Sequence, residues 1–146
     1  MYVTDASVWV ARLLPEDAHH AATMGWLDDA ISRYEILYAP VSLLSEVAGA
    51  LARRSGRSRI GREALETLQE VPSLRLEPIG HDLALLAGEL AADLRVRGAD
   101  ALYLALAVRL TVPLVSWDRE QRERGSGAVR TLSPEQASAD ERRDGE

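Results

Sequence analysis

The chain has 146 residues, of which 47% are hydrophobic and 27% are charged, and its formal net charge is −6. This composition predicts one globular domain with a single core and excludes a disordered chain. Cysteine and lysine are both absent, which excludes disulfides, thiolate chemistry, P-loop phosphate binding and Schiff-base catalysis. No apolar run is long enough to span a membrane and no secretion signal is visible, so we expect a cytoplasmic protein with no membrane partner.

Short apolar runs alternate along the chain with segments of helical period. We expect strands at residues 2–4, 36–39, 74–78 and 113–116, and a short edge strand at 129–132. We expect helices at about 6–14, 19–33, 42–54, 60–71, 82–96 and 100–110, and a short polar helix from Asp118. Strands separated by helices pair in parallel, which predicts an α/β three-layer sandwich with a central, mainly parallel sheet of four to five strands flanked by helices.

The domain is expected to cover residues 1–136. Residues 137–146 are polar and charged, which predicts a disordered C-terminal tail. Within the domain, Gly98 is expected to end the helix at 82–96, and Asp100 is in a position that suits the N-cap of the next helix.

Four acidic residues stand where these elements begin or end. Asp5 and Asp118 follow strands, whereas Glu46 and Asp100 lie in the opening turns of apolar helices. Because the carboxyl ends of parallel strands meet at one edge of a sheet, all four side chains can converge there. Four neighbouring carboxylates repel one another unless divalent cations lie among them. The pattern therefore indicates a Mg²⁺ or Mn²⁺ site that acts on phosphates.

Each acid also has an ordinary structural explanation. Asp5, Asp100 and Asp118 occupy positions that suit helix N-caps, a role that aspartate fills well. Glu46 belongs to a polar stripe that suits a solvated helix face. The joint pattern favours a site, because Asp5 follows a hydrophobic strand and Asp100 opens the most apolar helix, where an unpaired carboxylate is unfavourable.

Polar and aromatic residues accompany the acids. Ser7 and Ser116 each lie two residues from an acid and can orient a carboxylate or a bound water. Trp117 is predicted to line the cleft, where it can stack on bases. His19 and His20 are adjacent and point to different faces of a helix, so they are predicted to be surface residues.

All 17 basic residues are arginines, and four of them are candidates for contacts with the phosphate groups of a substrate. Arg53, Arg54 and Arg57 surround the end of the helix that carries an acid, and Arg97 lies just before another. The alternative is a solvated helix end, where basic residues also suit the helix dipole. The two interpretations have equal weight for this group.

Four segments resemble the motifs of the PIN-domain family, and in particular of the VapC-type ribonuclease toxins of type II toxin–antitoxin pairs. They are Val3-Thr4-Asp5-Ala6-Ser7-Val8, Ser45-Glu46, the run from Gly98 to Ala107, and Leu114-Val115-Ser116-Trp117-Asp118. The resemblance runs in order from about residue 1 to residue 136.

This resemblance implies an endoribonuclease in which Asp5, Glu46, Asp100 and Asp118 bind Mg²⁺ or Mn²⁺ and hydrolyse RNA phosphodiester bonds. It also implies a cognate antitoxin protein, and we expect a homodimer. Asp93 is a further candidate acid with no motif of its own. The alternative is a non-catalytic PIN-like module that binds RNA or a partner without cutting.

Overall fold

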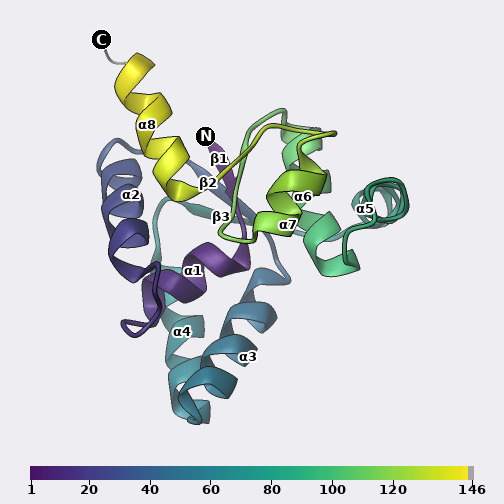
Figure 1. The fold of residues 1–146 in the computed structure, drawn as a ribbon. Coiled ribbons are helices and arrows are strands. Elements are labelled where there is room, and N and C mark those ends of the chain that lie inside the picture. Colours follow the sequence, from purple (N-terminus) through teal and green to yellow (C-terminus); the bar gives the residue numbers. More distant parts are fainter. Residues whose placement is uncertain (145–146) are drawn as a thin grey trace.

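A five-stranded parallel sheet forms the middle layer of the protein in the computed structural model, which describes residues 1–144 (Figure 1). Its strands lie in the order β3-β2-β1-β4-β5. The bounds are β1 (Tyr2–Thr4), β2 (Leu37–Pro40), β3 (Leu74–Glu77), β4 (Leu114–Val115) and β5 (Thr131–Leu132). Every neighbouring pair is parallel. The predicted α/β class and the parallel sheet are thus confirmed.

Helices flank the sheet on both sides (Figure 1). In this view α1 and α2 lie to one side of the strands and α5 and α6 to the other, while α3 and α4 form a hairpin that projects downward. None of the helices in the described residues has the length and hydropathy needed to cross a membrane. The bounds are α1 (Ala6–Leu13), α2 (His20–Ser32), α3 (Leu43–Ser55), α4 (Ser58–Glu70), α5 (His81–Leu94), α6 (Gly98–Leu110), α7 (Arg119–Gly125) and α8 (Pro134–Asp144).

Helix α6 is the buried helix that its composition predicts. It packs against β1, β2 and β4, and Tyr103 and Leu104 on it are fully buried. A helix that is apolar on most of its sides belongs in the interior of a domain. The first turn of α6 therefore lies at the edge of the sheet where β1 ends.

Strand β1 occupies the centre of the sheet, and the chain order reverses on either side of it. In open sheets of this kind, ligands bind beyond the carboxyl ends of the strands at such a reversal. The register pairs Thr4 with Val115, and the backbone N–H of Asp5 donates to the carbonyl of Val115 at 3.0 Å. The residues that follow, Asp5 and Ser116, therefore emerge side by side.

The connection between α5 and α6 differs from the expected one. Helix α5 ends at Leu94, and Arg95 supplies the left-handed turn with φ of 56°. The Arg95 carbonyl accepts a hydrogen bond from Arg124, which helps to hold this turn. Gly98 is consequently the first residue of α6 rather than the end of α5, and Asp100 lies in its first turn rather than at its cap.

The C-terminal segment is helical rather than disordered as far as residue 144. Ser133 and Gln136 form a reciprocal capping box, in which the Gln136 N–H donates to Ser133 Oγ at 3.2 Å and the Ser133 N–H donates to Gln136 Oε1 at 2.8 Å. Ala137 is fully buried, and the Tyr2 hydroxyl donates to Glu141 at 2.9 Å. The expected boundary at residue 136 thus falls inside α8, and the rest of the expected tail, residues 145–146, lies outside the described residues.

Candidate active site

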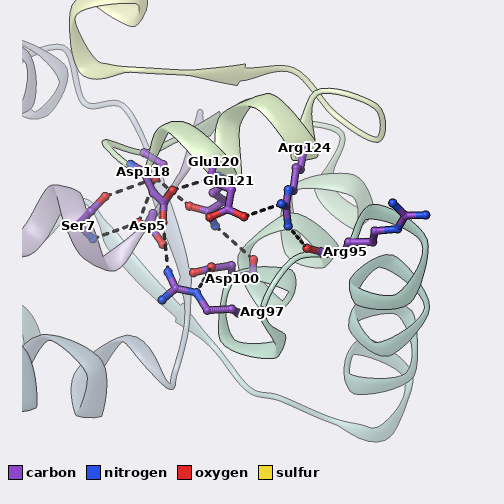
Figure 2. A network of polar contacts seen from close by, with 10 residues as sticks. Asp5, Ser7, Arg95, Arg97, Asp100, Asp118, Glu120, Gln121 and Arg124 are labelled. Carbon is purple, nitrogen blue, oxygen red and sulfur yellow. Dashed lines mark hydrogen bonds and ion pairs between the residues drawn. The ribbon is translucent and has the colours of Figure 1, made fainter.

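All four predicted acids line a single pocket of about 650 Å³. Asp5 follows β1, Glu46 lies in the first turn of α3, Asp100 lies in the first turn of α6, and Asp118 caps α7. The pocket opens at the carboxyl ends of β1 and β4, and Figure 2 shows three of the acids approaching one another there. Asp93 is exposed on α5 and does not line the pocket.

Asp5 is the most buried of the four acids, with a relative exposure of 5%. Its Oδ2 accepts hydrogen bonds from the backbone N–H of Ser7 and from the hydroxyl of Ser116, each at 3.1 Å. Burial raises the pKa of Asp5, and these hydrogen bonds oppose the rise. The bond from Ser7 also makes Asp5 the N-cap of α1, so the capping role and the pocket role belong to the same carboxylate.

The two predicted serines connect the strand ends beneath the pocket. Ser7 Oγ accepts from the backbone N–H of Trp117 at 3.0 Å, and Ser116 Oγ accepts from the backbone N–H of Asp118 at 3.0 Å. The two hydroxyl oxygens are 3.4 Å apart. Because Ser116 also donates to Asp5, the two serines fix the orientation of the Asp5 carboxylate relative to the β4–α7 turn.

Glu46 has a buried partner that sequence analysis did not identify. The hydroxyl of Tyr103 donates to Glu46 Oε1 at 3.1 Å, and Tyr103 has no exposed surface. Burial raises the pKa of Glu46, the bond from Tyr103 opposes this, and repulsion from Asp5 and Asp100 raises it further. Tyr103 lies three residues after Asp100 and so on the same side of α6, which is the signal that was available in the sequence.

Arg97 bridges the remaining two acids (Figure 2). Its Nε donates to Asp100 at 3.0 Å, and its Nη2 donates to Asp118 at 3.2 Å. Burial raises the pKa of Asp100, Arg97 opposes this rise, and the charge of Asp5 adds to it. The Arg97 side chain is 78% exposed, so water screens both ion pairs strongly.

Gln121 ties the α7 side of the pocket together, and it was not predicted. It is almost fully buried. Its backbone N–H donates to Asp118 Oδ1 at 3.0 Å, and its side-chain Nε2 donates to the carbonyl of Asp100 at 3.3 Å. Its Oε1 lies 2.8 Å from Ser116 Oγ. Gln121 therefore positions two acids without adding charge to the pocket.

The predicted arginine group divides in the structure. Arg53 and Arg54 line the pocket, and Arg54 pairs with Asp17 at 2.7 Å. Arg57 instead lines a separate pocket beside α1. Gly56, with φ of 71°, turns the chain at the end of α3 and carries Arg57 away from the acids.

An aromatic pair completes the pocket wall. Trp117 lines the pocket, as predicted, and the ring of His19 stacks on it at a centroid distance of 3.9 Å. His19 is exposed, as expected of a surface residue, but it also lines this pocket. The adjacent His20 turns away, and its Nδ1 lies 2.7 Å from the carbonyl of Ala11.

Within residues 1–144, no three acidic or histidine side chains already stand together in an arrangement that would hold a metal ion. The four acids share a pocket, but two of them face Arg97 and a third is held by two serines. Their predicted roles as metal ligands and catalytic groups stay predictions at this point.

A comparison with protein families matches residues 2–126 to the PIN domain. The chain therefore belongs to the PIN domain family. No curated protein matches it.

The fold is shared with solved structures of VapC toxins and toxin–antitoxin complexes. VapC20 from Mycobacterium tuberculosis is 19% identical, with a TM-score of 0.73 over 88% of this chain and 96% of that chain. FitAcB from Neisseria gonorrhoeae is 18% identical, with a TM-score of 0.71 over 92% and 98%. DNA-bound VapBC from Salmonella typhimurium is 14% identical, with a TM-score of 0.65 over 91% and 97%. At these identities the likeness shows the fold alone.

The raised pKa of Asp5 leads to a prediction about stability. A carboxyl whose pKa is raised by folding stabilises the protein below its ordinary pKa, near 4, and this contribution is lost as the pH rises through the folded value. Asp5→Asn keeps an oxygen acceptor and removes the charge. We expect this change to raise the free energy of unfolding at pH 7.5 in EDTA, as measured by urea denaturation.

Asp17→Asn is the matched control in the same pocket wall. Burial would raise the pKa of Asp17, but the bonds from Arg54 and from the His19 backbone lower it overall. Its ionised form therefore stabilises the fold at pH 7.5, and Asp17→Asn should reduce stability. A loss of stability in Asp5→Asn equal to that in Asp17→Asn would contradict the account of Asp5.

Proposed function

We propose that this protein is a divalent-metal-dependent endoribonuclease, and the toxin of a toxin–antitoxin pair. The observation that carries the proposal is the convergence of Asp5, Glu46, Asp100 and Asp118, from four separate elements, on one pocket. Membership of the PIN domain family supports it. So does the description of the similar VapC20 as a toxin that cleaves the sarcin–ricin loop.

The residues of the pocket fit a hard divalent cation. All the donors are carboxylate oxygens, which Mg²⁺ and Mn²⁺ accept as ligands. Burial raises the pKa values of Asp5, Glu46 and Asp100, so part of their negative charge lacks compensation. Asp5, Glu46 and Asp100 would hold the principal ion, and Asp118 would complete that site or hold a second ion.

The guanidinium of Arg97 occupies the position of a cation between two of these acids. It supplies a positive charge where a metal ion would lie, and this supports the proposal that Asp100 and Asp118 form a cation-binding pair. Because Arg97 is largely exposed, its release costs only about 1 kcal/mol or less for each pair. We infer that an ion bound at Asp100 displaces Arg97 at this small cost, and that the freed guanidinium then faces an RNA phosphate.

The reaction that we propose is hydrolysis of an RNA phosphodiester bond. A bound Mg²⁺ or Mn²⁺ would supply a water of lowered pKa and stabilise charge on the phosphoryl oxygens. Ser7 and Ser116 hold Asp5 in one orientation, and Tyr103 holds Glu46. Catalysis of this kind depends on such preorganised carboxylates, because a displacement of about 1 Å can reduce the rate by about two orders of magnitude.

Arg53 is the arginine best placed to meet the RNA backbone. It lines the pocket about two turns along α3 from Glu46, on the same face of the helix. Its guanidinium lies over Gly49, where an added Cβ would be 3.1 Å from Nη1. Its neighbour Arg54 is already engaged by Asp17 at 2.7 Å. We therefore assign the phosphate contact to Arg53 first, with Arg54 as a second contact.

The structural neighbours support a proposal about the partners of this chain. Those neighbours include VapBC complexes from Rickettsia felis and Haemophilus influenzae and a toxin–antitoxin complex from Klebsiella pneumoniae. We propose that this chain likewise binds a cognate antitoxin, and that it forms a homodimer.

The proposed function is tested by incubating the protein with a mixed pool of single-stranded and looped RNA in Mg²⁺ or Mn²⁺ and mapping the cut ends. We expect cleavage that EDTA abolishes. Asp5→Asn should reduce the rate by more than about 100-fold, even though the same change should leave the fold intact or stabilise it. Asp93→Asn is the matched control, and it should cut at the wild-type rate.

The same experiment distinguishes the non-catalytic alternative. If intact RNA survives in every metal while a partner or RNA still binds, the chain is a binding module rather than a nuclease. Cleavage by Asp5→Asn at the wild-type rate would reject the metal assignment.

Arg97 generates a prediction about metal affinity. Arg97→Gln removes a competing cation from Asp100 and Asp118, so the free protein should bind Mn²⁺ about fivefold more tightly, which corresponds to about 1 kcal/mol. Isothermal titration without RNA measures this. Arg119→Gln, which removes an exposed arginine paired with Glu123, is the control and should leave the affinity unchanged. Weaker Mn²⁺ binding by Arg97→Gln would show that the arginine supports the site instead.

Arg53 generates a prediction about salt dependence. Each phosphate contact to a single strand contributes about −0.7 to the slope of log K against log salt concentration. Arg53→Gln should therefore weaken RNA binding and flatten the slope by about 0.7, as measured by fluorescence anisotropy over a salt series. Arg57→Gln, whose side chain lies at the other pocket, should leave the slope unaltered. Equal slopes for Arg53→Gln and the wild type would remove Arg53 from the RNA surface.

A further inference from the structure

We propose that His19 and Trp117 form a stacking platform for one unpaired nucleobase, next to the phosphate that the carboxylates act on. The inference deepens the proposed nuclease function and rests on it, because it names the part of the RNA that the pocket recognises besides its backbone. The ligand is a single-stranded segment with at least one free base.

The two rings already have the geometry of a stack. Their centroids are 3.9 Å apart and their planes differ by 7°. Trp117 is half-buried and His19 is exposed, so the imidazole is the member of the pair on the solvent side. A base that lies on the imidazole extends an existing stack and does not have to displace a ring.

One buried threonine holds both members of the pair. The Trp117 indole Nε1 donates to Thr23 Oγ1 at 2.8 Å, and the same hydroxyl donates to the backbone carbonyl of His19 at 2.7 Å. Thr23 has no exposed surface. The His19 backbone N–H is also held, because it donates to Asp17 Oδ1 at 2.8 Å. The platform is therefore preorganised, and binding a base requires little further ordering of the protein.

The position of the platform matches the shape of a nucleotide. Trp117 stands between Ser116 and Asp118, so it is attached directly to the edge of the carboxylate cluster. His19, Trp117 and Arg53 line the same pocket as the acids. A nucleotide presents a flat base and a charged phosphate joined by a sugar, and this wall offers a flat aromatic surface, a guanidinium and a site for phosphate chemistry together.

Stacking on an aromatic ring needs the face of a base rather than its edge, so this platform tolerates different bases. It requires, however, that the base be unpaired and unstacked from its neighbours. The platform therefore selects single strands and loops over duplex RNA. Contacts to phosphates do not contribute to this selection, because duplex and single-stranded RNA carry the same phosphate groups.

The test measures binding with and without bases on the ligand. The probes are a labelled adenosine decamer and an abasic decamer of the same charge, titrated by fluorescence anisotropy with Ca²⁺ in place of Mg²⁺. The wild type should prefer the adenosine decamer. His19→Ala should bind it about tenfold more weakly and should bind the abasic decamer as the wild type does.

Two variants separate stacking from other effects of the substitution. His19→Phe keeps a flat ring without the imidazole nitrogens and should restore wild-type binding. His81→Ala removes an exposed imidazole at the start of α5 and should change nothing. His19 makes no side-chain cap to α2, so His19→Ala should fold, which a thermal melt checks.

Several results would overturn the platform. They are equal binding of the two decamers by the wild type, an equal loss on both decamers in His19→Ala, tighter adenosine binding in His19→Ala, and failure of His19→Phe to restore binding. On an RNA that the wild type cuts, His19→Ala should raise KM about tenfold and leave kcat unchanged. Absence of cutting by the wild type would reject the nuclease function, whereas cutting with an unchanged KM in His19→Ala would reject the platform alone.

Discussion

The rest of the structure depends on the concentration of negative charge at one edge of the sheet. Asp5, Glu46 and Asp100 are partly or almost fully withdrawn from water, and burial raises the pKa of each. Isolated carboxylates are unstable in such surroundings unless donors or cations face them. Most of the polar contacts around the pocket supply such donors. Ser7 and Ser116 donate to Asp5, Tyr103 donates to Glu46, and Arg97 donates to Asp100.

The architecture explains why this concentration arises where it does. Strand β1 is central, and its end and the end of β4 emerge together, which fixes Asp5 beside Ser116. Asp5 and Asp118 each cap the helix that follows, so their carboxylates are oriented by backbone N–H groups. The capping interpretation and the site interpretation are therefore not rivals. A cap fixes the direction of a carboxylate, and a fixed carboxylate is what a metal site needs.

Alternation of strands and helices was sufficient to predict the sheet, the buried α6 and the four acids in one pocket, because each depends on local pattern and parallel pairing. The serines that hold Asp5 were predicted from their spacing. Tyr103 was not, since it reaches Glu46 across 57 positions in the chain. Arg57 lines a separate pocket and not that of the acids, because the turn at Gly56 redirects the chain after α3. Helix α8 was missed although its capping residues, three apart and followed by no break, were visible in the sequence.

The pocket has a fixed half and an adjustable half. On the fixed half, Asp5 is buried and held by serines, and Glu46 is held by a buried tyrosine. On the adjustable half, the charges of Asp100 and Asp118 face an exposed arginine through screened ion pairs. Since such pairs contribute little to stability, a ligand of higher charge can replace the guanidinium without disturbing the fold. In the proposed nuclease, the fixed half would define where that ligand lies, and the released Arg97 would be free to pair with an RNA phosphate instead of with the acids.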